Sequence, residues 1–487
     1  MGEVPVASAV SATAEGVARR PLCVDLDGTL VKSDTLVDSL LLLVRAQPMQ
    51  AACAPLWLRR GKAAFKARVA ARVNLDVEHL PWNCQLLEYL AAERASGRKL
   101  YLVTGADASV ARQVAEHLGI FDGVLASDGA TNHTGANKLA GLRERFAEGF
   151  DYIGNARPDG AVLAGCGEAM VANPTRRLRA MIRSGRIPVS RSFDDRAGRG
   201  KSLLRAIRLH QWAKNVLIFF PLVLAHVVRP AALLNAALAF LCFSLCASAT
   251  YIVNDLLDIE ADRRHPKKRF RPFAAGDFSA ATGVAIAAVF LAAAFTGASF
   301  LPGKYIAWLV AYLVTTLAYS LRLKRMPLVD VLLLSGLYTL RLLAGAAAVD
   351  VRISRWFAAF SVFLFLSLAI VKRFSEMRTL QAKAEAPSNG RGYLAMDTEQ
   401  LRSFGTMSGI AAVVIFTLYI NSPETLALYR HPGRMWLIVP LLLWWIFRVW
   451  LLAGRGELDE DPVIFAVTDR LSLLIGLGIA VVAVLAV

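Results

Sequence analysis

The chain has 487 residues, of which 56% are hydrophobic, and it carries a formal net charge of +17. A mean hydropathy of +0.46 excludes an ordinary soluble enzyme, and the length predicts two or more domains. The positive charge suits anionic lipid headgroups and phosphorylated substrates. Nucleic acid is not expected as a partner, because the basic residues gather at predicted membrane edges and the sequence holds no nucleic-acid motif.

Residues 1–175 are expected to form an α/β domain. The stretch PLCVDLDGTL is a short apolar strand ending in D-x-D-G-T, and KLYLVTG and FDYIGNARPD are later strands that also end in polar residues. Residues 36–85 have apolar periodicity and predict a helical cap inserted after the first strand. Active sites of parallel α/β sheets lie at the carboxyl ends of the strands. The polar residues at or just after these strand ends are Asp25, Asp27, Thr104, Asn155 and Asp159, and Lys138 lies after the next candidate strand and helix start.

These elements, in this order, resemble the motifs of the haloacid dehalogenase-like phosphohydrolase superfamily. The resemblance implies a Rossmann-like fold in which Asp25 is the nucleophile that forms an aspartyl-phosphate. It further implies that Asp27 is the general acid and base. Thr104 and Lys138 would hold the transferred phosphoryl group.

The same resemblance implies a Mg²⁺ site made by Asp25, the main chain at Asp27, Asn155 and Asp159. Asn155 departs from the family pattern, which usually has Asp at this position. An amide oxygen can still bind Mg²⁺, with one negative charge fewer. Two interpretations therefore stay open, an active phosphatase and an inactive domain that senses phosphate.

Residues 176–200 are rich in arginine and predict a flexible basic tether along an anionic membrane surface. Residues 201–211, KSLLRAIRLHQ, predict a short amphipathic helix in the membrane interface. The arginines of the tether are Arg176, Arg177, Arg179, Arg183, Arg186, Arg191, Arg196 and Arg199.

Residues 201–487 are expected to form an all-α membrane bundle of about nine transmembrane helices. The predicted spans are about 212–228, 231–253, 281–301, 305–321, 328–349, 355–371, 406–421, 435–453 and 470–487. The loops that hold most of the basic residues, including the run 263–271, are expected on the inside. The chain begins with no charged-then-apolar signal segment. We therefore expect a multi-pass protein of the inner membrane, with the first domain and the loop after residue 253 in the cytoplasm.

The loop after the second predicted span carries a cluster of acidic residues followed by basic ones. Asn254, Asp255, Asp258 and Asp262 follow an N-D-x-x-D-x-x-x-D spacing, which places the acidic side chains on one face if the segment is a helix. Carboxylates on one face repel each other, and Mg²⁺ shared with substrate phosphates resolves that conflict. The bland alternative is a solvated, positive-inside loop. The basic residues downstream that could hold phosphates include Lys267, Lys268 and Arg271.

This half of the chain resembles the UbiA-type membrane prenyltransferase superfamily in its acid motif, its spans and a second loop, YSLRLKRMPLVD. That superfamily usually has a second aspartate cluster in this loop, whereas this chain has only Asp330 there. The stretches QWAKN, DRRHPKKRFRP, LRLLAG, VKR and DPVIFAVTD resemble, more narrowly, the decaprenyl-phosphate phosphoribosyltransferase branch. This implies transfer of 5-phosphoribose from 5-phosphoribosyl 1-diphosphate to polyprenyl phosphate, with release of diphosphate.

The resemblance also implies roles for single residues. Asn254, Asp255, Asp258 and Asp262 would hold Mg²⁺ and the leaving diphosphate, while the basic residues of the same loop would bind the donor. For Lys214 the alternative is simple snorkelling to the headgroups. Tyr319 and Lys324 match the second loop of the family. The candidates for the acceptor phosphate are Lys214, Arg341, Lys372 and Arg373.

Three hypotheses follow for the whole chain. The first is a bifunctional enzyme whose first domain removes the 5-phosphate from the lipid product, for cell-envelope arabinose or ribose chemistry. The second is a conventional prenyltransferase that uses a prenyl diphosphate and an aromatic acceptor, against which the lone Asp330 argues. The third is a non-enzymatic, membrane-anchored binding or scaffold protein whose first domain is a degenerate phosphate sensor. The intact acid cluster argues against it for the membrane half, whereas Asn155 leaves it open for the first domain, so that a transferase with an inactive sensor domain also remains possible.

Overall fold

The computed structural model describes residues 19–129, 133–227, 229–382, 391–458 and 461–487. The chain splits into two compact units. The first, here called the sheet unit, comprises Met1–Ser202 and Leu257–Ala280. The second, the helical unit, comprises Leu203–Leu256 and Ala281–Val487. The loop that carries the basic run and part of the acid motif therefore belongs to the sheet unit.

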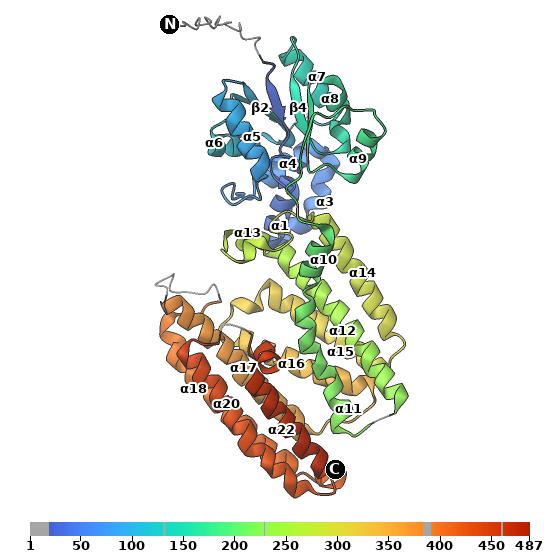
Figure 1. The fold of residues 1–487 in the computed structure, drawn as a ribbon, viewed down its shortest axis with the longest axis vertical. Helices are drawn as coiled ribbons and strands as arrows, with labels where there is room; N and C mark the ends of the chain where they lie inside the picture. The colour runs from blue at the N-terminus through green and yellow to red at the C-terminus, as the bar shows by residue number, and fades with distance from the viewer. Residues whose placement is uncertain (1–18, 130–132, 228, 383–390, 459–460) are drawn as a thin grey trace, which may run out of the picture. The chain divides into compact units, whose positions relative to one another are not determined.

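The sheet unit is built on a six-stranded parallel sheet with the strand order β3-β2-β1-β4-β5-β6 (Figure 1). This confirms the predicted α/β fold. Strand β1 is central, and it is completely buried, as are β4 and β5, because helices cover both faces of a parallel sheet. The strands are β1 Leu22–Val24, β2 Leu100–Asp107, β3 Gly123–Ser127, β4 Asp151–Gly154, β5 Ala169–Ala172 and β6 Arg191–Phe193.

Alternate side chains of β1 point to opposite faces of the sheet. Leu22 and Val24 belong to one hydrophobic cluster, whereas Cys23 belongs to another that contains Tyr152. A hydrophobic core therefore lies on each face. The helices that follow the strands are α5 Cys84–Ala95, α6 Ala108–Leu118, α7 Ala136–Arg145, α8 Gly160–Gly165 and α9 Arg176–Arg183.

The insertion between β1 and β2 is helical, as predicted for residues 36–85. Asp34 caps its first helix by accepting hydrogen bonds from the main-chain N–H groups of Leu36 and Val37, at 3.0 and 3.1 Å. Such an N-cap satisfies donors that have no partner within the helix. The elements are α1 Thr35–Ala46, α2 Pro48–Ala52, α3 Ala54–Trp57, η1 Leu58–Arg60 and α4 Lys62–Ala70.

The prediction of a flexible tether over residues 176–200 is wrong. This segment contains α9 and β6, and β6 pairs in parallel with β5, with Val171 opposite Ser192. Leu178 and Phe193 are buried and attach the segment to the sheet. The arginines of this segment lie at exposed positions between the buried side chains. The high arginine content therefore suggested a tether, although the segment contains a helix and a strand.

The loop 257–280 is attached to the sheet unit by main-chain and side-chain contacts. It contains the short helices α13 Ile259–Arg264 and η4 Lys268–Phe270. Asp277 accepts hydrogen bonds from the N–H of Ala197 at 3.1 Å and from the hydroxyl of Ser202 at 3.3 Å. Gly276 has φ 74° and packs so closely on Lys32 that a Cβ would lie 2.6 Å from the Lys32 Cβ. Only glycine fits both conditions.

The helical unit contains fewer long helices than the nine predicted spans. Among the described residues, seven helices are long and apolar enough to cross a membrane, or up to eight if the bent pair α21–α22 counts as one span. The predicted span 212–228 is instead a 3₁₀ segment, η3 Leu209–Phe219, followed by the five-residue α11 Phe220–Leu224. Arg208 and His226 have positive φ values of 55° and 53°, which interrupts regular helix on both sides of this segment.

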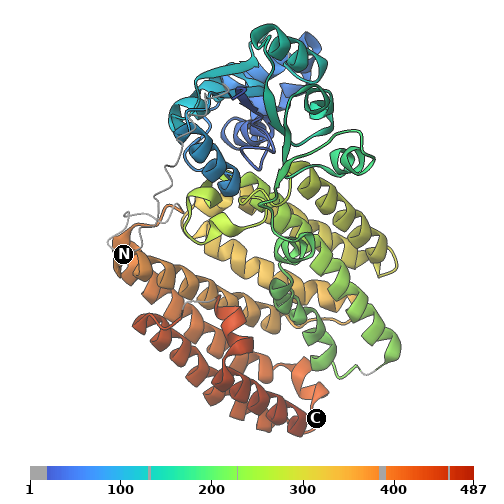
Figure 2. The same ribbon diagram turned by 45° about the horizontal axis from the view of Figure 1, so that its top comes forward.

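The long helices of this unit lie side by side in the views of Figures 1 and 2. They are α12 Pro230–Leu257, α14 Ala280–Ala298, α15 Gly303–Leu321, α16 Val329–Ala348, α17 Arg355–Ala382, α18 Thr398–Ile420 and α20 Ile438–Arg455, with α21 Pro462–Thr468 bent by 77° against α22 Arg470–Ala486. Length and composition identify the unit as an integral membrane bundle.

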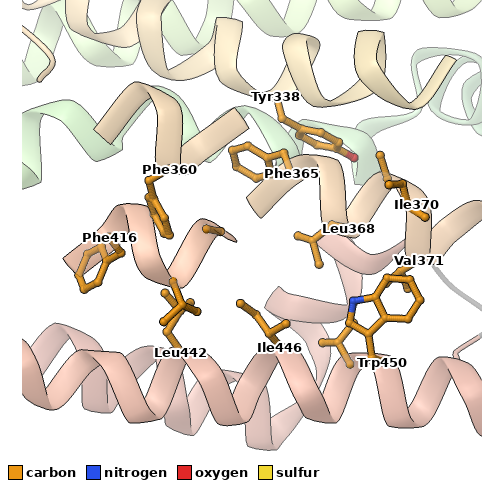
Figure 3. Close-up of a cluster of buried hydrophobic side chains, with 14 of the residues drawn as sticks. Tyr338, Phe360, Phe365, Leu368, Ile370, Val371, Phe416, Leu442, Ile446 and Trp450 are labelled. Carbon is orange, nitrogen blue, oxygen red and sulfur yellow. The ribbon is translucent and has the colours of Figure 1, made fainter. Parts of the chain in front are cut away.

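The largest core of the helical unit joins α16, α17, α18 and α20 through aromatic and branched side chains (Figure 3). Trp450 of α20 donates from its indole N–H to the hydroxyl of Ser367 at 3.0 Å. That hydroxyl in turn donates to the carbonyl of Gly405 at 2.7 Å. A Cβ at Gly405 would lie 2.1 Å from the Trp450 ring. Glycine at this position therefore lets α18 approach α20 and fixes one end of the bundle.

Candidate functional site

The carboxyl end of β1 carries the centre of a polar cluster in the sheet unit. Asp25 is buried, and its Oδ1 lies 2.8 Å from the Nζ of Lys138, which α7 supplies. The hydroxyl of Thr29 donates to Oδ2 of Asp25 at 3.2 Å. Because β4 lies beside β1, Asp159 reaches the same place, and its Oδ1 is 3.2 Å from Lys138 Nζ. One ammonium group is therefore shared by two carboxylates.

Tyr152, in the middle of β4, completes this cluster. Its hydroxyl donates to Asp159 Oδ1 at 2.9 Å and accepts from Lys138 at 2.8 Å. The two carboxylates outweigh burial and raise the pKa of Lys138, so the ammonium stays charged. Burial raises the pKa of Asp25 to about 6, against the opposing effect of Lys138. Tyr152 was not predicted as a site residue. The alternation of side chains along β4 places it on the same face as Gly154, the last residue of the strand.

Asp27 lies two residues beyond Asp25 in a different environment. Its Oδ1 accepts the N–H of Thr35, the first residue of α1, at 2.8 Å. Burial, and secondly the nearby Asp34 carboxylate, raise the pKa of Asp27 to about 8. A carboxyl group with this pKa is protonated at neutral pH and can act as a general acid.

Thr104 lies where it was predicted, on the strand beside β1. Leu102 is opposite Val24 in the ladder, so Thr104 lies two residues further along the edge at which Asp25 emerges. It is fully buried, and its hydroxyl accepts the N–H of Ala106 at 3.0 Å. The strand continues beyond the predicted end to Asp107, with a shift in register after Val103.

Lys66, from α4 of the insertion, was not predicted as part of this site. Its Nζ donates to the carbonyl of Gly105 at 2.5 Å. Burial lowers the pKa of Lys66, while the carboxylates of Asp27 and Asp34 oppose that change. Lys66 is one of two lysines in a short alanine-rich helix, and nothing in the sequence distinguishes it as a site residue.

The residues expected to bind Mg²⁺ in the sheet unit have the right donor chemistry. Asn155 is buried, and a Cβ on Gly28, at φ 76°, would lie 1.9 Å from its Nδ2. The Asn155 side chain thus packs directly on the D-x-D-G turn. The carboxylates of Asp25 and Asp159 and the amide oxygen of Asn155 are hard oxygen donors, which Mg²⁺ prefers. Asp159 already accepts at Oδ2 from the N–H groups of Asn155 and Ala156, at 3.2 and 3.0 Å.

The helical unit contains a cavity of about 270 Å³ between η3, α12, α15, α16, α17 and the start of α21. Six of the predicted residues line it, and basic and aromatic side chains dominate its polar wall. Lys324 is joined to the wall, since its Nζ donates to Asn254 Oδ1 at 3.4 Å. The predicted residues that line the cavity are Lys214, Asn254, Tyr319, Arg341, Lys372 and Arg373.

Two lysines in this cavity share one carboxylate. Lys214 Nζ and Lys372 Nζ each lie 2.7 Å from Oδ2 of Asp461. Tyr338 donates to Oδ1 of Asp461 at 3.2 Å, and the N–H of Val463 donates to the same atom at 3.2 Å. The position of Lys214 favours a site residue over a snorkelling one, because its side chain is only 9% exposed. Asp461 itself was not predicted, although it opens the stretch DPVIFAVTD.

Arg341 is buried in the same wall and is held on several sides. Its Nε donates to Asn215 Oδ1 at 2.8 Å. Its guanidinium lies 5.2 to 5.4 Å from the ring centres of Phe243, Tyr312 and Tyr338, at cation–π distance. This charge is rigidly placed before any substrate arrives.

Arg373 and Asp330 form a buried pair rather than two separate site groups. Arg373 Nε lies 2.6 Å from Asp330 Oδ2, and neither side chain is more than 1% exposed. Arg373 also binds Glu376 and donates to the Tyr319 hydroxyl at 3.2 Å. Arg373 is thus held by these partners while it lines the cavity, and its predicted role in binding the acceptor phosphate stays a prediction. Arg391, which was not predicted, donates to Tyr319 at 2.9 Å and lines the cavity.

The acid motif does not lie on one helix face, which corrects the prediction from its spacing. Helix α12 ends at Leu257, Asp258 has φ −98° and ψ 10°, and α13 begins at Ile259. Asn254 and Asp255 belong to the helical unit, whereas Asp258 and Asp262 belong to the sheet unit.

Each acid of the motif has a cationic partner within its own unit. Asp255 is paired with Arg208, Asp258 with Arg45 at 3.5 Å, and Asp262 with Arg271 at 2.7 Å. Each unit therefore supplies oxygen donors of the kind that Mg²⁺ prefers, and the guanidinium groups show that positive charge is accommodated at the three carboxylates. Lys267 and Lys268 are exposed on the sheet unit.

Residues 216–474 match the family model described as the UbiA prenyltransferase family. The chain is 38% identical over 464 residues to the uncharacterized protein y4nM of Sinorhizobium fredii, covering 94% of this chain and 90% of that one. It is 35% identical over 282 residues to the decaprenyl-phosphate phosphoribosyltransferase of Mycobacterium tuberculosis, covering 57% and 91%. A solved UbiA homolog from Archaeoglobus fulgidus, bound to GPP and Mg²⁺, is 16% identical with a TM-score of 0.46, covering 58% and 99%.

Proposed function

Because the chain belongs to the UbiA prenyltransferase family, we propose that its helical unit transfers 5-phosphoribose from 5-phosphoribosyl 1-diphosphate to a polyprenyl phosphate. A mycobacterial relative carries the name of this activity. The observation that carries the proposal is the pair of ammonium groups, Lys214 and Lys372, on one carboxylate in a cavity that also contains Arg341. Such a site suits the phosphate of a lipid acceptor, because fixed positive charges attract an anionic group.

In the proposed reaction a phosphate oxygen of the lipid attacks the anomeric carbon of the donor. The new C–O bond forms as the bond to diphosphate breaks, and diphosphate leaves with the electron pair. The attacking phosphate is already anionic, so no general base is required. Lys214 and Lys372 bind it, and Arg341 adds a fixed positive charge. These residues act by positioning and by neutralising charge.

Mg²⁺ is the cofactor in this proposal. Asn254, Asp255, Asp258 and Asp262 would hold it, and when bound it neutralises the negative charge of the diphosphate. Lys267, Lys268 and Arg271 bind the donor phosphates in this scheme. We propose that the acid motif faces the cytoplasm, and the basic run beside it supports this orientation by the positive-inside rule.

The pairing of Asp330 speaks against a conventional prenyltransferase with an aromatic acceptor. Asp330 is fully buried and accepts from both Arg373 and Tyr393. It therefore offers no second acidic cluster for the diphosphate of a prenyl donor. The proposed phosphoribosyl transfer requires only the acid motif at residues 254–262 and basic side chains that bind the acceptor phosphate.

The direct test is an assay of the purified full-length chain in lipid nanodiscs. Labelled 5-phosphoribosyl 1-diphosphate is supplied with polyprenyl phosphate, and in parallel a prenyl diphosphate is supplied with an aromatic acid. We expect a labelled lipid of phosphoribosyl mass in the first reaction alone. Product in the second reaction without product in the first would overturn the proposal.

A second activity is favoured by the cluster around Asp25 in the sheet unit. We infer that this unit hydrolyses a phosphomonoester, with the 5-phosphate of the lipid product as the proposed substrate. Asp25 attacks phosphorus, and the bond to the sugar oxygen breaks as Asp27 gives that oxygen its proton. Water then releases phosphate from the aspartyl-phosphate, with Asp27 as base. Lys138 balances the charge on Asp25.

The alternative for this unit is a phosphate sensor without turnover, and Asn155 is the observation behind it. One negative charge fewer would weaken the Mg²⁺ site. The same assay distinguishes the two activities, because loss of one phosphate group changes the mass of the labelled lipid. Accumulation of only the phosphorylated lipid in wild type would favour the sensor.

A further inference from the structure

The tip of the helical insertion, residues 47–62, exposes apolar side chains. Met49, Leu56 and Leu58 are 83%, 57% and 51% exposed. Among the described residues of the sheet unit, the other exposed large hydrophobic side chains are Val44, just before the tip, and Phe270. Four of these five side chains therefore lie between residues 44 and 58. This is a concentration in one place, unlike the scattered exposure that is normal on protein surfaces.

The backbone beneath these side chains is folded and anchored. The tip consists of α2, α3 and η1, and Ala54 at the start of α3 is buried. The guanidinium groups of Arg72 and Arg68 lie 4.5 and 5.5 Å from the ring centre of Trp57, at cation–π distance. Arg72 Nε also donates to Oε1 of Gln50 at 3.0 Å. An ordered surface, and not a frayed end, therefore presents the apolar side chains.

Basic residues follow the apolar ones directly. Arg59, Arg60 and Lys62 are exposed, and the sequence has no acidic residue between Asp38 and Asp76. Exposed apolar side chains beside basic ones are typical of segments that lie in a membrane interface. The apolar groups enter the headgroup region, and the basic groups attract anionic lipids.

The covalent connections of the sheet unit keep it next to a bilayer. The chain passes between the two units at residues 202–203, 256–257 and 280–281. Helices α12 and α14, on either side of the loop 257–280, are long and apolar enough to cross a membrane. A membrane surface is therefore present at high effective concentration.

We propose that residues 47–62 form a docking surface for an anionic lipid bilayer. The exposed apolar side chains lie among the headgroups, and Arg59, Arg60 and Lys62 lie beside the lipid phosphates. This docking is independent of the reactions proposed above, because it depends only on the surface of the insertion.

Docking has a consequence for the polar cluster of the sheet unit. Helix α1, before the tip, begins with Thr35, whose N–H donates to Asp27. Helix α4, after the tip, supplies Lys66, which donates to the carbonyl of Gly105. The insertion thus joins tip and cluster, and a docked tip fixes the orientation of the cluster toward phosphates carried by lipids. This consequence, unlike the docking itself, rests on the proposed phosphatase.

The docking is tested on full-length protein in nanodiscs, with the photo-crosslinking residue p-benzoylphenylalanine in place of Leu56. Mass spectrometry of the peptides after irradiation identifies what position 56 contacts. In nanodiscs that contain phosphatidylglycerol we expect a peptide that has gained the mass of one lipid. The same residue in place of Glu116, exposed on α6, is the matched control and should give no lipid adduct.

The role of charge is tested by combining Arg59→Gln with Arg60→Gln. We expect about a threefold or larger loss of the lipid adduct, since two basic groups near an anionic surface are removed. Nanodiscs of phosphatidylcholine alone should give a similar loss. Arg176→Gln with Arg177→Gln removes the same charge from exposed positions on α9 and should leave the adduct unchanged.

The outcomes separate the docking from the proposed phosphatase. A crosslink from position 56 to the helical unit, the absence of a lipid adduct, or an equal adduct in phosphatidylcholine overturns the docking on an anionic bilayer. Leu56→Ser with Leu58→Ser should slow dephosphorylation of phosphoribosyl lipid about fivefold and leave hydrolysis of ribose 5-phosphate unchanged. Equal effects on both substrates would overturn the orienting role. A lipid adduct in a protein that hydrolyses neither substrate supports the docking and refutes the phosphatase.

Discussion

The two clusters at the centre of this protein have opposite charge arrangements. In the sheet unit one ammonium group, Lys138, is shared by the carboxylates of Asp25 and Asp159. In the helical unit one carboxylate, Asp461, is shared by the ammonium groups of Lys214 and Lys372. The first cluster is left with excess negative charge and the second with excess positive charge.

This difference teaches how each cluster can meet a phosphate. A negative cluster repels a phosphate until a metal ion has compensated its charge, so we expect the proposed phosphatase to need Mg²⁺ for substrate binding as well as for chemistry. A positive cavity attracts a phosphate directly. In the proposed transferase reaction the metal is instead expected at the acid motif, where it would neutralise the charge of the leaving diphosphate. The following predictions test this contrast, from the largest expected effect to the smallest.

Asp25→Asn should lower phosphatase turnover by about 1,000-fold or more, because it replaces the proposed carboxylate nucleophile by a neutral amide of nearly the same volume. Transfer in the helical unit should not change. Mass analysis of the lipid products would then find the 5-phosphorylated lipid accumulating. Asp194→Asn is the control for a neutralised carboxylate on the same unit. Equal dephosphorylation in wild type and Asp25→Asn would remove Asp25 from the mechanism.

Asp255→Ala should lower phosphoribosyl transfer by about 100-fold or more, since a buried ligand of the divalent cation is lost. Dephosphorylation of added phosphoribosyl lipid should persist. Rates of both reactions, measured on the same preparation, check this. Asp350→Asn, with 80% of its side chain exposed, is the matched control in the helical unit. A normal transfer rate that still requires Mg²⁺ would relocate the metal site.

Lys214→Met should raise the KM for polyprenyl phosphate by about tenfold, with a smaller change in KM for the sugar donor, because one charge-assisted hydrogen bond to the acceptor is lost. The apolar length of the side chain is kept. Lys304→Met, at 79% exposure, controls for loss of charge from the helical unit. If the KM of the donor rises instead, the cavity binds the sugar diphosphate and the assignment of the two phosphates is reversed.

The Mg²⁺ requirement of the phosphatase should fall as the pH rises. Burial raises the pKa of Asp25 to about 6 and that of Asp27 to about 8, so below these values protons compete with the metal. Deprotonation between pH 6 and 8 then strengthens binding, by at most about tenfold per pH unit for each proton displaced. Titrations of Mg²⁺ at pH 5.5, 6.5 and 7.5 measure the trend. Asn155→Asp, which adds a carboxylate, should reduce the requirement at every pH.

Much of the architecture was predictable from the sequence because its signals are local. The apolar strand before D-x-D-G-T, the polar residues at later strand ends and the long apolar stretches each depend on neighbouring positions. They gave the parallel α/β fold, the helical insertion, most of the membrane helices and six residues of the cavity wall. The local sequence gave a wrong prediction at residues 176–200, because the many arginines masked the few buried apolar residues, such as Leu178 and Phe193, that attach this segment to the sheet. The prediction was also wrong at 212–228, where apolar composition did not reveal the broken backbone.

The pairing of charges was decided only by the tertiary structure. Lys214 and Asp461 are separated by 247 residues, and nothing near either residue specifies the other. The regular acid spacing likewise did not reveal that α12 ends at Leu257 and that α13 begins at Ile259, with Asp258 between them. By itself the sequence determined which groups are available and which segments are strands or helices, because these depend on local periodicity and residue chemistry. Which charges neutralise one another depends on burial and distance in the folded chain, and only the fold provides these.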